Sequence, residues 1–173
     1  MDLGDIASQV PAIKKAYLMH KDFSTATMTN VFKSIKEPVK LMANEAASCW
    51  FENMGEGVFT KHQLPPEAQF SPVNCVLIND YNKDGVSDIL LAGNEYQTEV
   101  MTGQYDASYG VLLLGTTNKT FTYVPQTKSG IFLRGDTRCM RSLSVNKKEI
   151  IIAAINNSPL QLYQLNLQQE AKH

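Results

Sequence analysis

Acidic and amide side chains recur at alternate positions around a glycine in one stretch of this chain, residues 80–88, which reads DYNKDGVSD. Four side chains and one backbone carbonyl can supply oxygen atoms, those of Asp80, Asn82, Asp84, Asp88 and Val86. Gly85 permits the sharp turn that folds these oxygens inward. Ca2+ takes six to eight oxygen ligands in proteins, at about 2.3–2.6 Å. The stretch therefore predicts a site for a hard divalent cation, with Ca2+ as the expected ion and a solvated turn without metal as the alternative.

The segments on either side of these residues are short, apolar and rich in β-forming residues. They read VNCVLI at 73–78 and ILLAGN at 89–94, and neither has room for an amphipathic helix of about ten residues. The first nine positions of the stretch resemble an EF-hand loop, but Leu91 stands at the twelfth position, where that motif needs a bidentate glutamate. The sequence therefore predicts a cation loop that joins two strands.

Charge is distributed unevenly along the 173 residues, although the net charge is only −1. Residues 41–110 carry two lysines against ten acidic residues, whereas residues 111–173 carry eight lysines and arginines against three acidic residues. The acidic part contains the cation loop, so the field there favours a divalent ion, with chance placement of surface charge as the alternative. No nucleic-acid partner is expected, because the chain has neither a basic stripe nor a recognised motif.

With 43% apolar and 19% charged residues, the chain has the composition of one ordinary soluble domain. Cys49, Cys75 and Cys139 form no C-x-x-C pair, which argues against a structural zinc or a redox dithiol and leaves one disulfide open. The first 20 residues lack the apolar region of a signal peptide, and no run approaches the ~18 apolar residues of a membrane span. We therefore expect either a cytosolic protein or a piece of a longer one, without a membrane span.

Hydrophobic periodicity divides the chain into a helical segment, residues 1–36, and a strand-rich segment, residues 37–173. In the helical segment, Pro11 can begin a helix with one face formed by Ile13, Ala16, Tyr17 and a half-buried His20. Thr27 can cap a second helix, with an inward face formed by Met28, Val31 and Phe32.

Ten stretches have the period of strands. They are residues 39–43, 48–53, 58–62, 73–78, 89–94, 110–115, 120–124, 137–143, 149–155 and 160–165. Trp50, Phe51 and Phe59 are expected to be packing residues around a turn at residues 55–57, with an exposed aromatic platform as the alternative.

The polar stretch 95–109 has a length at which a loop without structure of its own is often functional. Its candidate contacts with a partner are Tyr96, Glu99, Tyr105 and Asp106.

A resemblance follows from these motifs. Strand, D-x-N-x-D-G-x-x-D, strand and G-N, as they stand at residues 73–94, resemble the repeat of the FG-GAP/VCBS family found in integrin-like β-propellers. Further stretches are similar to the C-terminal part of such repeat proteins of the ASPIC/UnbV-associated type: FENMGEGVF at 51–59, LPPEAQFSPV at 64–73, TEVMTGQYDA at 98–107 and IIAAINNSPLQLY at 151–163. The resemblance implies a calcium-stabilised propeller, extracellular or on the outer-membrane surface of a bacterium, that binds a protein or glycan and performs no known chemistry.

About ten strands fall short of a closed propeller, which uses at least four blades of four strands. We expect a mainly β fold, a partial β-propeller of about two to three antiparallel blades with a short N-terminal helical segment. The remaining blades would come from elsewhere in a larger protein or complex, or from self-association, because open blades expose sheet edges and an apolar face. Residues 144–149, SVNKKE, stand where a second cation loop would lie but lack its acidic series, so no metal is predicted there.

The chain contains no nucleophile elbow, no H-E-x-x-H and no paired-carboxylate motif. We therefore predict a non-enzymatic calcium-binding module for protein or glycan binding or a structural role. The alternative is a propeller-type hydrolase, or another enzyme whose active site has no recognisable motif. Arg134, Arg138 and Arg141 are expected on a solvated strand face, and Asp136 beside Arg138 in a local turn or a surface ion pair.

Overall fold

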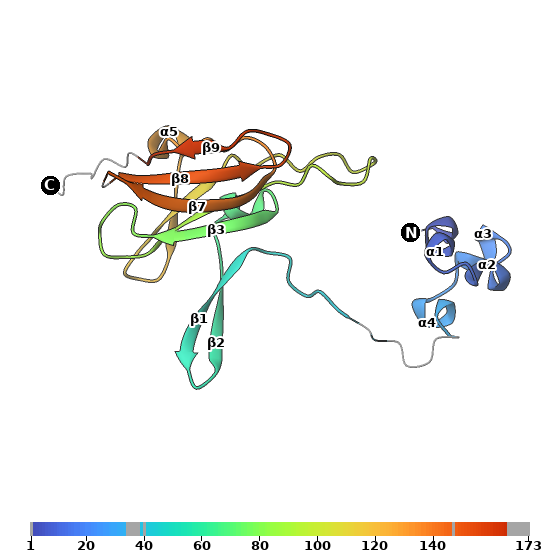
Figure 1. The fold of residues 1–173 in the computed structure, drawn as a ribbon. Coiled ribbons are helices and arrows are strands. Elements are labelled where there is room, and N and C mark those ends of the chain that lie inside the picture. The colour runs from blue at the N-terminus through green and yellow to red at the C-terminus, as the bar shows by residue number, and fades with distance from the viewer. Residues whose placement is uncertain (1, 34–38, 40, 147, 166–173) are drawn as a thin grey trace. The chain divides into compact units, whose positions relative to one another are not determined.

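This computed structural model describes residues 2–33, 39, 41–146 and 148–165, drawn as a ribbon in Figure 1. The chain forms two compact units, Met1–Glu45 and Ala46–His173, which we call the helical unit and the sheet unit. The predicted boundary between residues 36 and 37 falls at residues 34–38, which lie outside the described part. The fold is mainly β, as predicted, with 36% of residues in strands and 17% in helices.

The helical unit contains α1 (Leu3–Gln9), α2 (Ile13–Ala16), α3 (His20–Phe23) and α4 (Met28–Val31). A capping box begins α1, because the Asp2 carboxylate accepts from the Asp5 N–H at 2.9 Å and Asp5 accepts from the Asp2 N–H at 3.0 Å. Apolar side chains of α1, α2 and α4 pack together as a small core, which includes Leu3, Ile6, Ile13 and Val31.

The helical predictions are only partly correct. Thr27 caps α4, as predicted, and accepts from the Asn30 N–H at 3.3 Å. The single helix from Pro11 to His20 is wrong, because Tyr17 has an extended backbone that ends α2. His20, which was expected to be half-buried, and Met28, which was expected to face inward, are both exposed.

The sheet unit contains three antiparallel sheets built from strands that follow one another in the chain. The first is a hairpin of β1 (Cys49–Gly55) and β2 (Val58–Gln63). The second is a four-stranded sheet of β3 (Val73–Asn79), β4 (Asp88–Gly93), β5 (Val111–Gly115) and β6 (Phe121–Val124). The third is a three-stranded sheet of β7 (Thr137–Val145), β8 (Lys148–Ile155) and β9 (Gln161–Tyr163). Nine of the ten predicted strands are confirmed, and the strand at 39–43 is wrong, because residues 41–43 form no strand.

The main core lies between the four-stranded and the three-stranded sheets, where β3 contacts β7 (Figure 1). Leu90 and Leu112 of the four-stranded sheet are 0% and 1% exposed, and Met140, Ile151 and Ala153 of the three-stranded sheet are equally buried. Burying a leucine completely contributes about 1.5–3 kcal/mol, so this interface holds the two sheets together.

A second core covers the opposite face of the four-stranded sheet. There Leu91 and Leu113 pack against Leu64, Ala68 and the half-buried Trp50. Ala68 belongs to a short 3-10 helix, η1 (Pro66–Gln69), that follows the β1–β2 hairpin.

The β3–β4 and β7–β8 hairpins share two local features. In both hairpins a bulge lies next to the second-to-last strand pair. This pair is Cys75–Ala92 in β3–β4 and Cys139–Ala154 in β7–β8. An asparagine N–H closes each hairpin: Asn94 donates to the Pro72 carbonyl at 3.0 Å and Asn156 to the Asp136 carbonyl at 2.8 Å. Similarly, a proline-initiated helical turn follows β1–β2 and β5–β6, namely η1 and α5 (Gln126–Ser129).

The described residues do not form a closed propeller. Within the described part of the chain, no helix has the length and apolar character needed to cross a bilayer.

Polar side chains link the two sheets at the ends of their hairpins. Asn74 donates from Nδ2 to the carbonyls of Asn94 and Thr137 at 2.8 and 3.1 Å, and the buried Asn94 donates to the Gly135 carbonyl at 3.0 Å. These bonds satisfy backbone carbonyls that would otherwise lie at the inter-sheet boundary without partners.

Arg138 forms a wider ion-pair network than predicted. Its guanidinium donates to both Glu95 carboxylate oxygens at 3.0 and 2.7 Å and to Asp136 at 2.6 Å. The predicted ion pair between Asp136 and Arg138 forms, but its expected surface position is wrong for the aspartate, because Asp136 is only 1% exposed. The hydrogen bonds from Arg138 lower the pKa of Glu95 below its ordinary value.

Candidate metal site in the loop between β3 and β4

The acidic loop, residues 80–87, joins β3 to β4, so the prediction that it lies between two strands is confirmed. Asn79 and Asp88 pair across the end of the two strands and close the loop at its base. Gly85 has a φ of +89°, a left-handed conformation that glycine adopts without steric cost. Lys83 also has a positive φ, of 61°, at the top of the turn.

Three of the predicted ligands fold the loop through hydrogen bonds to its own backbone. Asp80 accepts from the N–H groups of Asp84 and Gly85 at 3.0 and 2.9 Å. The side-chain oxygen of Asn82, Oδ1, also accepts from the Asp84 N–H, at 3.0 Å. Asp84 accepts from the Val86 N–H at 2.8 Å and from the Asn82 amide at 2.9 Å. These side-chain-to-backbone bonds are the Asx turns that bend the chain at this point.

Asp88 is the fourth predicted side-chain ligand and is fully buried at the start of β4. Its Oδ2 accepts from the N–H groups of Tyr81 and Asn82 at 2.8 and 3.4 Å, and its Oδ1 accepts from the Gly115 N–H at 2.9 Å. Burial raises the pKa of Asp88 despite these three N–H donors, and the nearby Asp84 carboxylate adds to the rise. One carboxylate therefore ties both the loop and the end of β5 to β4.

The candidate ligands are all oxygen atoms, which is the donor type that a hard cation such as Ca2+ prefers. The structure brings Asp80, Asn82, Asp84 and Asp88 into one hydrogen-bonded loop, with no lysine or arginine among the described residues paired to its carboxylates. However, no three acidic, histidine or cysteine side chains in the described part are arranged as a ready metal-binding group. Calcium binding at this loop remains a prediction.

A hollow of about 490 Å3 separates the acidic loop from the three-stranded sheet. Tyr81 lines it, and its hydroxyl is buried without a hydrogen-bond partner among the described residues. Burial raises the pKa of Tyr81 above its ordinary value, and the nearby carboxylates of Glu149 and Asp88 raise it further. Glu149 of β8 also lines the hollow and accepts from the Asn79 amide at 2.6 Å.

Sequence reasoning missed the residues that support the loop from elsewhere in the chain. Gly115 lies 27 residues from Asp88, and Glu149 lies 70 residues from Asn79. No local spacing signals such contacts, because they depend on how β5 pairs with β4 and on how the two sheets pack.

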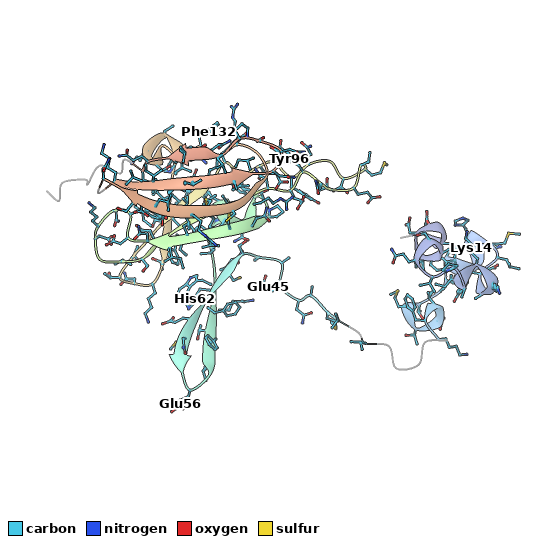
Figure 2. The ribbon with its side chains drawn as sticks, in the orientation of Figure 1. Lys14, Glu45, Glu56, His62, Tyr96 and Phe132 are labelled. Carbon is cyan, nitrogen blue, oxygen red and sulfur yellow. The ribbon has the colours of Figure 1, made fainter. Side chains whose placement is uncertain are left out.

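The predicted partner contacts lie along the 95–109 loop. A two-way backbone bridge between Glu95 and Tyr105 closes the loop at its base, at 3.0 and 2.9 Å. Glu99 begins a turn further out, and Thr102 donates to its carbonyl at 2.9 Å. Glu99, Tyr105 and Asp106 are exposed, whereas Tyr96, labelled in Figure 2, is half-buried.

A second hollow, of about 600 Å3, lies between the β1–β2 hairpin and the turn that joins β5 to β6. Trp50 stacks on His62 with ring centroids 4.4 Å apart, and it meets the Phe121 ring edge-on at 5.9 Å. Glu52 contacts His62 at 3.1 Å and is also paired with Lys119, whose hydrogen bond lowers the pKa of Glu52. Figure 2 shows His62 on this hairpin.

The aromatic residues of the hairpin differ from one another in burial. Trp50 packs against the second core, as predicted. Phe51 and Phe59 are 60% and 58% exposed, so their assignment as packing residues is wrong. The reason is the strand alternation, which turns Trp50 toward the four-stranded sheet and both phenylalanines away from it.

Comparison of the chain with protein-family models, with curated proteins and with solved structures finds no match. The resemblance to FG-GAP/VCBS repeats thus depends on the motif residues alone.

Proposed function

We propose that the sheet unit is a non-enzymatic calcium-binding module of the FG-GAP/VCBS propeller type, with a binding or structural role at the bacterial cell surface. Calcium would stabilise the β3–β4 junction, and the 95–109 loop would contact a protein or glycan. The observation that carries the proposal is the buried Asp88, whose carboxylate holds the acidic loop and β5 together and has no cationic partner among the described residues.

A divalent cation would remove an electrostatic cost that the loop otherwise bears. Asp80, Asp84 and Asp88 lie within nine residues, and burial already disfavours the ionised form of Asp88. A bound cation reverses that effect, because it favours the ionised carboxylates. An ionised carboxylate has about four lone-pair sites, so Asp80 and Asp88 keep acceptor capacity beyond the backbone N–H groups they bind. The cation would be held by Asp80, Asn82, Asp84, Asp88 and the Val86 carbonyl.

Thermal unfolding of the chain in Ca2+ and in EDTA tests this proposal. Calcium at about one hundred times its dissociation constant would add about 2.7 kcal/mol to the free energy of unfolding. Extracellular calcium modules have dissociation constants of about 10⁻⁴–10⁻³ M, so the titration should extend well above that range. Asp84→Asn removes one exposed charge with little change in size, and it should abolish the calcium response while melting near the wild-type temperature in EDTA.

The matched control is Asp106→Asn, the same substitution at an exposed acid outside the loop. It should keep the full calcium response. Identical wild-type melting in Ca2+ and EDTA would exclude a stabilising site, and a response that survives Asp84→Asn would locate the ion elsewhere.

We favour binding over catalysis because the titratable groups at the larger hollow are engaged with one another. Glu52 is paired with both His62 and Lys119, and the His62 ring is stacked on Trp50. Such pairing supports a structural link between the hairpin and the four-stranded sheet.

A further inference from the structure

The matching bulges allow residues of the four-stranded sheet to be aligned with residues of the three-stranded sheet. Ala92 and Ala154 occupy the same position beside the bulge, so Leu90 of β4 corresponds to Ile152 of β8. Leu90 lies in the core between the two sheets. Ile152, two residues before Ala154, lies on the face of the three-stranded sheet turned away from that core, because Ile151 and Ala153 point into it.

This outer face of the three-stranded sheet carries apolar side chains around Arg141, which is the cross-strand neighbour of Ile152. Its cross-strand neighbours are Ile152 with Leu162 and Ile150 with Leu143. Leu162 is 66% exposed and Leu143 is 49% exposed. Single exposed apolar residues are ordinary, but a contiguous set on one sheet face indicates a site for interaction.

A second face with exposed aromatic side chains lies on the β1–β2 hairpin, where Phe51 and Phe59 are neighbours of Lys61. The hairpin turns Trp50 and Glu52 toward the four-stranded sheet and leaves Phe51 and Phe59 exposed on its opposite side. A short helix with a proline at its start follows both this hairpin and β5–β6. The hairpin therefore precedes the four-stranded sheet in the way that β5–β6 precedes the three-stranded sheet. Its outer side is therefore the position at which a preceding sheet would pack.

We propose that the outer face of β7–β9 in one copy of the chain packs on the outer side of β1–β2 in a second copy. In this contact the outer face of β7–β9 takes the part that the Leu90 face of the four-stranded sheet has in the main core. The β1–β2 hairpin of the second copy takes the part of the three-stranded sheet. The contact is head-to-tail, so each added copy presents a further free face and the assembly grows with concentration or closes into a ring.

Sedimentation velocity of the full chain over a wide range of concentrations tests the contact. The wild type should increase in mass with concentration. One double variant, Leu143→Asp with Leu162→Asp, adds charge to the outer face of β7–β9. The other, Phe51→Asp with Phe59→Asp, adds charge to the outer side of β1–β2. All four side chains are exposed, so both variants should fold, and circular dichroism checks this. Each variant alone should be a monomer.

Mixing the two variants is the decisive measurement, because each keeps the face that the other has lost. A head-to-tail contact predicts one-to-one dimers in the mixture and nothing larger. The control is Val100→Asp with Met101→Asp, at positions 96% and 90% exposed on the 95–109 loop, and it should associate as the wild type does.

Four outcomes would overturn the proposal. They are a wild type that stays monomeric, a mixture without dimers, loss of association in the control, and association that survives either face variant.

Discussion

Asp88 connects three parts of the chain through one side chain. Its oxygens accept N–H groups from the acidic loop and from Gly115 at the end of β5, and the residue itself begins β4. The other acidic residues of the loop bind only backbone and amide groups within the loop. Asp88 therefore has a structural role that does not depend on any metal.

We expect Asp88→Ala to destabilise the chain even in EDTA. The substitution leaves three backbone N–H groups without their acceptor, and a buried unsatisfied donor costs about 1–3 kcal/mol. Chemical denaturation in EDTA should show a loss of about 3 kcal/mol or more in the free energy of unfolding, while Asp84→Ala, at an exposed position, should lose far less. An equal loss in the free energy of unfolding for the two variants would contradict the structural role of the buried Asp88 carboxylate.

At this scale the sequence predicts residue types well and their partners poorly. The alternation of Asp80, Asn82 and Asp84 identified a hydrogen-bonded loop, because the required oxygens are close together in the chain. The burial of Asp136 and the pairing of Arg138 with Glu95 were missed, because Glu95 lies 43 residues from Arg138 and reaches it only when β4 packs near β7.

Among the elements, β5 and the acidic loop approach each other unusually closely. A Cβ atom on Gly115 would lie 2.3 Å from the Ser87 carbonyl oxygen, so no other residue fits at this position without displacing backbone. The glycine thereby brings its own N–H within reach of Asp88.

Gly115→Ala should separate β5 from the loop. We expect a lower melting temperature in EDTA and a smaller rise on adding Ca2+, because the substitution disturbs the Asp88 carboxylate. Gly57→Ala is the control: its φ of +80° makes the substitution cost about 1 kcal/mol, but no atom lies within 4 Å of the added Cβ. The control should retain the wild-type calcium increment, and a normal increment in Gly115→Ala would contradict the coupling.

Strand positions followed from the sequence because the period of two persists wherever a strand has a partner. Residues 39–43 show the same period and yet form no strand in the described part, since alternation alone supplies no neighbour to pair with. The exposure of Phe51 and Phe59 was missed for a related reason, as periodicity separates two faces of a hairpin without indicating which is covered.

For the molecule as a whole, the division into two units means that each has its own core. The apolar clusters of the sheet unit contain no residue of the helical unit, and the helical cluster contains none from the sheets. The sequence predicted two segments of different character, and the structure sets the limit of the sheet unit at Ala46.

A fragment of residues 46–173 should therefore fold without the helical unit. Its near-ultraviolet circular dichroism should retain the signal of Trp50, and its melting temperature should match that of the β transition of the full chain. A fragment that is unfolded or melts much lower would show that the helical unit stabilises the sheets.

Each of the three sheets in the described part of the chain pairs strands that are consecutive in sequence, from β1–β2 to β8–β9. Each hairpin therefore closes over a short length of chain, and little loop entropy is lost before its contacts form. The hairpins can form in order along the chain, since the β3–β4 pair needs no later strand. Slow steps should then come from docking one finished sheet on the next.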